Sequence, residues 1–399
     1  MEKINVVREI NELKNHLAYS KNIGFFFGAG TSCALNIPNV EQLTSGIGTA
    51  LTGDFKNHFD LIKNDLTASV APRIVNIEDI LNHIRRIREL TGEATSKNYV
   101  GVSGEAAKRL DKEICTKIYN LILEKEKVAD LETTKKFFAW LSILNREFSK
   151  EVFTTNYDLI IEKSLESGQI PYFDGFVGAY EPFFWQESID KLVGKDDLTQ
   201  NWIRLWKIHG SLSWFWKEDV KTKSPKIVRI GKVEKIEDEK DELVIYPSKE
   251  KYDSSRKQPF VAYFDRLKNY LLNGELLFIF TGYSFSDQHI NEIIFNCLRQ
   301  NNRLSALVFF FKDEEVEALH NLTSSYMNLI VFGPKKAIIN GNLGEWEFSE
   351  LAEFEKDKKP FDHFWSKADS KLTLGEFKSF VNFLITNSGK RDLIESKVK

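Results

Sequence analysis

The sequence is poor in cysteine, balanced in charge and without long apolar runs, and each of these absences excludes a class of protein. Its 399 residues include only Cys33, Cys115 and Cys297, which form no Cys-x-x-Cys pair, so we expect neither a zinc site nor a disulfide framework. No apolar run approaches the roughly eighteen residues of a membrane span, and the N-terminus lacks the apolar core of a signal peptide. We therefore expect a cytoplasmic protein that holds no metal and contacts no membrane.

The charge of the chain gives no bias toward nucleic acid, because 55 basic and 58 acidic residues leave a formal net charge of -3. One local basic run, Arg-Arg-Ile-Arg at residues 85–88, fits either a solvated helix face or a contact with nucleic acid. A solvated face is the more common outcome for such a run, so we expect no direct nucleic-acid binding. The sequence contains no Walker-type Gly-x-x-x-x-Gly-Lys-Ser/Thr loop, which argues against ATP hydrolysis.

What the sequence does contain is a short stretch rich in glycine and hydroxyl residues, Gly28-Ala29-Gly30-Thr31-Ser32. It follows the apolar run 23–27 and precedes a helix-compatible segment at 40–50, an order in which backbone amides can face phosphate oxygens. The third glycine of the dinucleotide fingerprint is missing, with Cys33 in its place, and the expected acidic residue about twenty positions later is absent. These departures count against an ordinary NAD dehydrogenase. Two interpretations remain: a nucleotide site, or a plain strand-turn-helix corner.

The rest of the chain alternates between β-forming runs and helical periodicity. Strands are predicted at residues 23–27, 151–155, 203–208, 276–280, 304–311 and 328–332, with an antiparallel excursion at 218–246. The clearest helical stripe is formed by Ile77, Ile80, Leu81, Ile84 and Ile87, with Asn76 as its N-cap. The alternation predicts an α/β fold with a Rossmann-like, mostly parallel sheet and helices on both faces. We expect the α/β domain at 1–50 and 148–335, a large helical insertion at 51–147 and a helical C-terminal accessory segment at 336–399.

Four polar clusters follow predicted strands and should meet at one edge of the sheet, because ligands of such sheets bind beyond the carboxyl ends of the strands. They are residues 28–32, 154–158, 209–210 and 282–284. The amide of Asn156 can fix a ribose hydroxyl or hold a water molecule, although Asn and Asp at such a turn often cap the local backbone instead. Among seven histidines, His209 is the strongest catalytic candidate, since it follows a strand and an imidazole accepts a proton near neutral pH.

These motifs carry a family resemblance. Gly-Ala-Gly-Thr-Ser with Pro38 downstream, Thr-Thr-Asn-Tyr-Asp at 154–158, Lys-Ile-His-Gly-Ser at 207–211 and Gly-Tyr-Ser at 282–284 resemble, in order and spacing, the NAD-binding motifs of the sirtuin family. In particular the chain is similar to the sirtuin-like NADases of bacterial anti-phage defence. The resemblance implies cofactor-binding roles for Gly28, Ala29, Gly30, Thr31, Ser32, Pro38, Asp158, Gly282 and Ser284. It further implies that Asn156 contacts the nicotinamide ribose and helps to place the attacking water, and that His209 is the catalytic histidine.

The departures from the family pattern bear on the reaction. Deacylating sirtuins carry a four-cysteine zinc module that three scattered cysteines cannot build, and they have Gln where Thr155 stands. The resemblance therefore implies an NAD⁺ hydrolase that passes through an oxocarbenium-like state and yields nicotinamide and ADP-ribose, without a metal. The alternatives are a module that senses NAD or ADP-ribose without cleaving it, and a protein deacylase or ADP-ribosyltransferase.

The implied activity would deplete the NAD of its own host, so we expect it to depend on assembly or on a ligand. The resemblance extends to family members that form homo-oligomers or assemble with a HerA-type hexameric ATPase. Both are expectations for this chain. The insertion and the C-terminal segment offer the accessory surfaces that such control needs.

Overall fold

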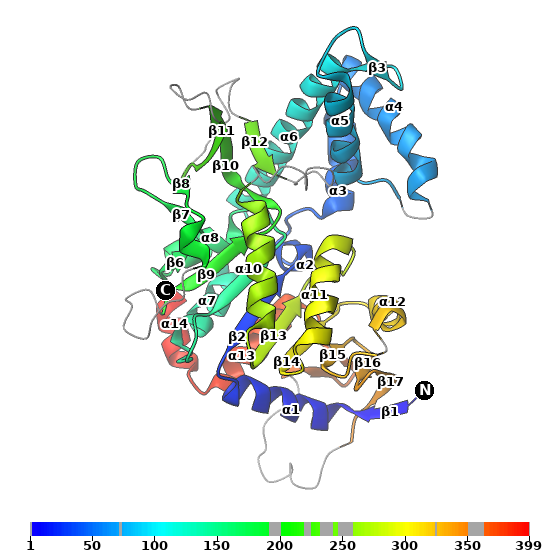
Figure 1. Cartoon of the computed structure of the whole chain (residues 1–399). Helices are drawn as coiled ribbons and strands as arrows, with labels where there is room; N and C mark the ends of the chain where they lie inside the picture. Colours follow the sequence, from blue (N-terminus) through cyan, green and yellow to red (C-terminus); the bar gives the residue numbers. More distant parts are fainter. Residues whose placement is uncertain are drawn as a thin grey trace.

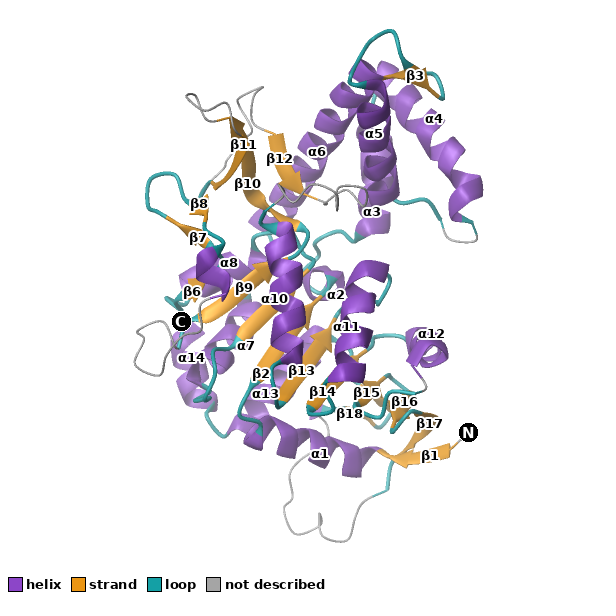
Figure 2. Cartoon of the chain, viewed as in Figure 1, coloured by secondary structure: helices purple, strands orange, loops and turns teal. Residues whose placement is uncertain are grey.

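The computed structural model describes residues 2–71, 74–190, 201–218, 225–231, 242–245, 258–323, 325–349 and 363–398. It is a mixed α/β structure built on one large sheet flanked by helices (Figures 1 and 2). The strands, in order across this sheet, are β1 (Glu2–Asn5), β17 (Asn342–Glu347), β16 (Lys336–Ile339), β15 (Leu329–Phe332), β14 (Leu304–Phe309), β13 (Leu276–Thr281), β2 (Ile23–Phe27), β5 (Glu151–Thr154), β9 (Ile203–Lys207) and β6 (Tyr172–Phe173).

The centre of the sheet is parallel and doubly wound. From β2 the chain builds β5 and β9 on one side, then crosses to build β13, β14 and β15 on the other, and all five neighbouring pairs are parallel. This is the Rossmann strand order, in which ligands bind where the winding reverses, here between β2 and β13. The predicted fold class is therefore confirmed, and the six predicted strands are all present.

Alternation along β2 shows how the two faces of the sheet are covered. Phe25 and Phe27 point to one face and Phe26 to the other, and all three side chains are buried, as expected for a strand covered on both sides. On the first face lie α1 (Val6–Tyr19), α7 (Glu132–Ile143), α8 (Ile160–Ser167), α13 (Phe377–Ser388) and α14 (Arg391–Val398). On the second face, at the front of Figure 1, lie α10 (Phe260–Leu272), α11 (Gln288–Gln300) and α12 (Asp313–Thr323).

The predicted helical insertion has a core of its own. Within the predicted bounds 51–147 it contains α4 (Gly53–Val70), α5 (Ile77–Thr91) and α6 (Gly104–Lys127), with a short hairpin of β3 (Asn98–Tyr99) and β4 (Val102–Ser103). Helix α3 (Val40–Ala50), which precedes these bounds, packs into the same core. The predicted stripe of α5 is buried, and Asn76 caps that helix in a capping box with Asp79. The insertion lies beyond the carboxyl end of the sheet (Figure 1), and its core continues onto Ile160 and Leu212. By contrast, α7, which follows α6, packs on the sheet itself.

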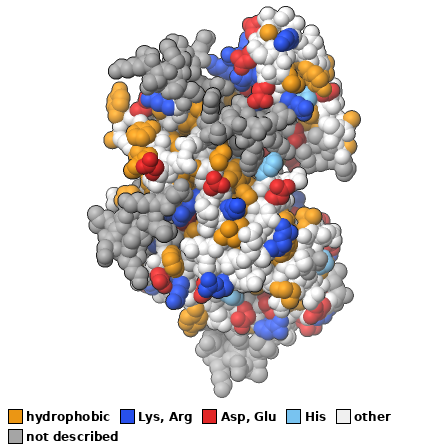
Figure 3. All heavy atoms as spheres, viewed as in Figure 1, with side chains coloured by type: hydrophobic (Ala, Val, Ile, Leu, Met, Phe, Trp, Pro, Cys, Tyr) orange, Lys and Arg blue, Asp and Glu red, His pale blue; other side chains and the backbone are white. Residues whose placement is uncertain are grey.

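The basic run on α5 is not the solvated face that we predicted. The guanidinium groups of Arg85 and Arg88 turn toward Asp111 on α6, and their side chains are only 12% and 17% exposed. Asp111 is buried, and although burial alone would raise its pKa, the two guanidinium charges hold that pKa below its ordinary value. The prediction failed because periodicity places Arg85 on α5 but does not show that a carboxylate faces it from another helix. On the face drawn in Figure 3, basic and acidic side chains of the described residues are interspersed.

The excursion after β9 forms a second, antiparallel sheet, as predicted. Its strands, in order across the sheet, are β12 (Glu242–Ile245), β10 (Gly210–Glu218), β11 (Pro225–Arg229), β8 (Phe183–Phe184) and β7 (Phe176–Val177). A helical turn, α9 (Glu187–Asp190), follows β8. The sequence did not reveal β10, which begins directly after His209 and so carries the chain from the main sheet into the second one.

The start of the C-terminal segment is not helical, contrary to our expectation. Strands β16 and β17 form a hairpin that extends the main sheet, and β1 pairs with β17 at the edge. The turn is Asn340-Gly341, both with positive φ, which is the dipeptide that two-residue hairpins favour and the signal that we missed. A small pair, β18 (Trp365–Ser366) and β19 (Lys371–Leu372), precedes α13 and α14, which are helical as predicted. None of the helices in these described ranges is long and apolar enough to cross a bilayer.

Candidate functional site

The loop after β2 is held against the loop after β13 by backbone contacts at the point where the winding reverses. The amide of Gly28 donates to the carbonyl of Thr281 at 3.0 Å, and the amide of Gly30 donates to the carbonyl of Gly282 at 2.9 Å. Gly282 has a φ of +66°, and a Cβ added there would lie 2.5 Å from the backbone nitrogen of Thr31. Only glycine allows the two loops to approach this closely.

Asn156, at the end of β5, ties its own loop to the first one. Its Nδ2 donates to the carbonyl of Gly28 at 3.0 Å, to Oγ1 of Thr31 at 3.0 Å and to Oγ of Ser32 at 2.9 Å. These three acceptors fix the orientation of the carboxamide, which is buried. Within the described residues no hydrogen bond reaches its Oδ1, so the oxygen is the atom that a ligand can use.

Asp158 continues the same network. Its Oδ2 accepts from Oγ of Ser32 at 2.7 Å, and its Oδ1 accepts from the amide of Ile160, the first residue of α8, at 3.1 Å, so the carboxylate joins the first loop to the start of that helix. Thr31 donates from Oγ1 to the carbonyl of Gly28 at 2.9 Å. The hydroxyl and carboxylate groups of both loops are therefore interlocked rather than simply adjacent.

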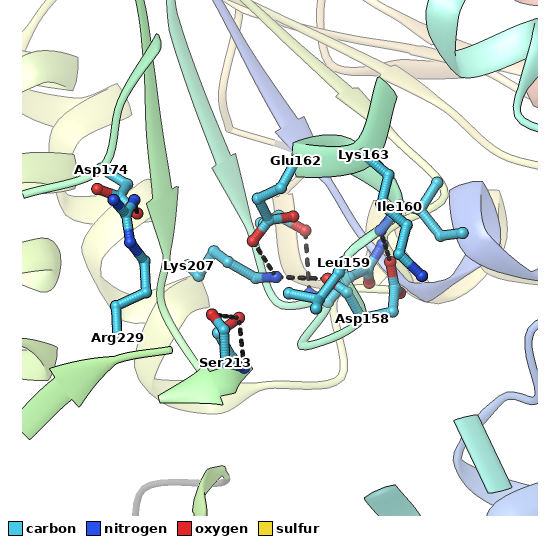
Figure 4. Close-up of polar contacts among 12 residues, drawn as sticks. Asp158, Leu159, Ile160, Glu162, Lys163, Asp174, Lys207, Ser213 and Arg229 are labelled. Atoms are coloured by element: carbon cyan, nitrogen blue, oxygen red, sulfur yellow. Dashed lines mark hydrogen bonds and ion pairs between the residues drawn. The ribbon is translucent and has the colours of Figure 1, made fainter. Parts of the chain in front are cut away.

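A buried lysine on β9 holds the loop at 156–160 in place. Nζ of Lys207, on β9, donates to the backbone carbonyl of Asp158 and to Oε1 of Glu162 at 2.8 Å (Figure 4). The side chain of Lys207 is 2% exposed, and burial raises the pKa of Glu162 despite this ammonium partner. The lysine and glutamate hold the position of the backbone that carries Asp158.

His209, at the end of β9, pairs with a residue that the sequence did not identify. Its Nε2 lies 3.0 Å from Oδ2 of Asp287, and Oδ1 of Asp287 accepts from the amides of His289 and Ile290 at the start of α11. Strands β9 and β13 are three positions apart, which at about 4.8 Å per strand is about 14 Å. The hydrogen bond between His209 and Asp287 therefore joins segments that follow strands on opposite sides of β2 and β5.

The surroundings of this pair raise the pKa of the imidazole and lower the pKa of the carboxylate. Burial alone would lower the pKa of His209, but the hydrogen bond to Asp287 and the charges of Glu78 and Asp287 outweigh it and raise that pKa. Burial alone would raise the pKa of Asp287, but His209 and the two helix amides lower it to about 2. The charge of Glu78, in the first turn of α5, adds to the effect of Asp287 on the His209 pKa.

The insertion is also anchored to the second loop. Oε1 of Glu126, near the end of α6, accepts from the amide of Leu159 at 2.7 Å, and Oε2 pairs with Nζ of Lys163. The Glu126 side chain is fully buried, and burial together with the charge of Asp158 raises its pKa. Helix α6 thus contacts the chain directly after the loop at 154–158, so a displacement of the insertion would be transmitted to that loop.

The structure brings most of the predicted site residues together, with differences among them. The amides of Gly28, Gly30 and Thr31 donate hydrogen bonds within the protein. Ala29 and Gly30, where α2 (Ala29–Cys33) begins, are nevertheless exposed, so a phosphate can reach the chain there. Ser284 is exposed, and its hydroxyl lies 2.6 Å from that of Ser286. Pro38 is half-buried in the segment between α2 and α3 and takes no part in the hydrogen-bond network.

The groups gathered at this end of the sheet are of the kinds that a dinucleotide binds through. A dinucleotide needs exposed backbone or hydroxyl donors for its phosphates and a carboxamide or imidazole for its ribose. Ala29, Ser284, Asn156 and His209 supply these groups at one end of the sheet. No group of three His, Cys, Asp or Glu side chains among the described residues is arranged to hold a metal.

Comparison with known proteins finds a family model that matches part of the chain. Residues 150–330 match the family model of the SIR2-like domain. The matched segment contains Asn156, Asp158, His209 and Gly282, while residues 28–32 precede it and join it through the hydrogen bonds of Asn156. No curated protein matches this sequence.

Solved structures of Sir2 proteins are similar to this chain at low identity. A mutant Sir2 homologue in complex with 2′-O-acetyl ADP-ribose is 14% identical, covers 75% of this chain and 83% of its own, and has a TM-score of 0.34. A Sir2 homologue in complex with NAD is 14% identical, with coverages of 77% and 84% and a TM-score of 0.32. Because these identities and TM-scores are low, the function is inferred from the hydrogen bonds of the site and from the match of residues 150–330.

Two supporting residues were missed by sequence reasoning. Asp287 is recognisable from the sequence only as an N-cap before an apolar helix, and a cap does not reveal a histidine partner. Lys207 was read as part of a motif, whereas its burial beneath Asp158 follows from its inward position on β9. Both act across strands that are distant in sequence.

Proposed function

We propose that the protein is an NAD⁺ hydrolase that cleaves the bond between nicotinamide and ribose. The observation that carries the proposal is that Asn156 and His209 follow the neighbouring parallel strands β5 and β9 at the carboxyl edge of the sheet, within the segment that matches the SIR2-like domain. A carboxamide oxygen and an imidazole suit the ribose next to the departing nicotinamide. Ala29, Gly30 and Ser284 are proposed to face the phosphates and the adenosine side, while Gly28 and Ser32 hold the first loop in place beneath them.

The chemistry needs no group beyond water. The bond between C1′ of the ribose and the nicotinamide nitrogen breaks, and its electron pair leaves with nicotinamide. The oxygen of water bonds to C1′, and the proton released in this step passes to His209 and then to solvent. Asn156 orients the water or a ribose hydroxyl through Oδ1, and the carboxylate of Asp158 stabilises the positive charge that develops on the ribose.

A sensor that binds NAD or ADP-ribose without cleavage is the second candidate. The interlocked loops of Ser32, Asn156 and Asp158 would serve such a sensor equally well. The paired His209 favours catalysis, because binding alone does not require a proton acceptor held beside a carboxylate. Deacylation and ADP-ribosyl transfer would both need an acceptor groove.

The test is to incubate the purified protein with NAD, with and without an acylated peptide, and to measure nicotinamide, ADP-ribose and deacylated peptide. We expect nicotinamide and ADP-ribose in equal amounts, independent of peptide. His209→Gln should abolish release, while His83→Gln, which alters a histidine beside Asp65 on the insertion, should not. Binding of NAD without nicotinamide would establish the sensor instead, and release that requires peptide would establish acyl transfer.

We further propose that assembly controls this activity, either as a homo-oligomer or with a HerA-type hexameric ATPase, in anti-phage defence. The anchoring of the insertion to Leu159 by Glu126 supports such control, because a partner bound to the insertion would shift the loop that carries Asp158. Light scattering with and without the ATPase, followed by the nicotinamide assay on each species, tests both forms. An unchanged mass and an unchanged rate would contradict control by assembly.

A further inference from the structure

Hydrogen bonds and burial hold the loop at 282–287, which carries Asp287, in one conformation. Asn291, on the first turns of α11, donates from Nδ2 to the carbonyl of Phe285 at 2.7 Å and accepts from the hydroxyl of Tyr283 at 3.1 Å. Phe285 has a φ of +54°, which a bulky residue adopts only where surrounding contacts hold it. Tyr283, Phe285 and Asn291 are all buried, so the loop cannot relax toward solvent.

This support fixes the carboxylate of Asp287 in one orientation. One oxygen, Oδ1, is occupied by the amides of His289 and Ile290, and the other, Oδ2, faces Nε2 of His209 at 3.0 Å. Because an ionised carboxylate only accepts hydrogen bonds, Nε2 must carry the proton. Within the part of the chain that is described, no hydrogen bond reaches Nδ1 of His209.

We propose that Asp287 is a positioning residue that holds His209 in the Nε2-protonated tautomer, so that Nδ1 is the nitrogen that accepts the proton during nicotinamide release. The inference rests on the proposed hydrolysis and adds to it a specific atom and a residue outside the family motifs that we identified from the sequence. Asp287 itself does not touch the substrate. It acts through the orientation and the proton affinity of the imidazole.

The charges around His209 come from two directions. Asp287 lies in the loop before α11, and Glu78 lies in the first turn of α5; the charges of both raise the pKa of His209. The same two carboxylates contribute to the raised pKa of Tyr283. The Glu78 charge remains when Asp287 is neutralised, so removal of Asp287 should weaken the proton affinity of His209 without abolishing the effect of the other carboxylate.

The test compares Asp287→Asn with the full-length wild-type protein. Asn keeps an acceptor for the helix amides and nearly the same shape, so the N-cap is retained while the charge is lost. We expect kcat for nicotinamide release to fall by about a hundredfold or more, with KM changed by less than about threefold, since substrate contacts are intact. Asp287→Glu should recover part of the loss. Asp65→Asn, which removes the carboxylate 3.3 Å from His83, should leave kcat unchanged.

Histidine NMR separates this inference from the proposed function, because it requires no turnover. With His209 assigned by His209→Gln, its neutral imidazole should be protonated at Nε2, and its pKa should fall in Asp287→Asn but not in Asp65→Asn. An unchanged His209 pKa, an Nδ1-protonated tautomer or a wild-type kcat in Asp287→Asn would each overturn the inference. A wild-type protein that releases no nicotinamide would overturn the proposed hydrolysis, and the titration would still decide the pairing.

Discussion

Gly282→Ala should separate the loops after β2 and β13 and is the sharpest structural test of the site. An alanine at a φ of +66° costs about 1–2 kcal/mol in backbone strain. Its Cβ would lie 2.5 Å from the nitrogen of Thr31 and 2.8 Å from the carbonyl carbon of Gly30, and because both are backbone atoms the loops must move. Overpacking of this kind adds about 1–3 kcal/mol, and loss of the hydrogen bond between Gly30 and Gly282 adds about 1 kcal/mol. We therefore expect about 3–6 kcal/mol of lost stability.

Gly389→Ala provides the matched control. Gly389 has a φ of +64°, close to that of Gly282, but a Cβ there would meet nothing within 4 Å, so only the backbone strain of about 1–2 kcal/mol remains. Urea unfolding followed by tryptophan fluorescence gives both free energies of unfolding, and calorimetric titration with NAD gives the affinity. Equal losses of stability for the two variants, or wild-type NAD affinity in Gly282→Ala, would refute the close approach of the loops.

Three further changes test the contacts around the site. Asn156→Asp should lower the free energy of unfolding by about 3 kcal/mol in urea denaturation, because a carboxylate would face the carbonyl of Gly28 in a buried position; an unchanged midpoint would contradict the network. His209, whose pKa is raised on folding, stabilises the protein fully below its unfolded pKa of about 6.5 and loses this contribution as pH rises through the folded value. The difference in free energy of unfolding between wild type and His209→Gln should therefore shrink above pH 6.5 in urea titrations. A difference that grows with pH would show that folding lowers the His209 pKa and would contradict this prediction. Asp111→Asn should lower the free energy of unfolding by about 3 kcal/mol in thermal melts, because Arg85 and Arg88 lose their buried anion. A loss close to zero, as for a surface ion pair, would contradict this.

The fold could be predicted from the sequence because its strands are locally distinct. The run Ile23–Phe27 is apolar throughout and ends in glycine, which is typical of a buried parallel strand at a ligand site. The hairpin of β16 and β17 was missed because its strands are short and lie among charged residues, so Asn340-Gly341 was the only local sign. The solvated face expected at 85–88 failed for a related reason, since burial of Arg85 depends on Asp111 of a different helix.

The candidate site was predictable in its loops and not in its pairings. Residues at the ends of β2, β5 and β13 could be placed together because parallel strands present their carboxyl ends on one edge. Which atom of Asn156 faces the first loop, and which carboxylate holds His209, depend on side-chain orientation across strands. These orientations cannot be predicted from the local sequence.

The release of nicotinamide from NAD by the wild-type protein, followed beside His209→Gln and Asp65→Asn, tests the central claim most directly. The account predicts that nicotinamide and ADP-ribose appear together with wild type and with Asp65→Asn, and that neither appears with His209→Gln. Equal release by wild type and by a folded His209→Gln variant would contradict it.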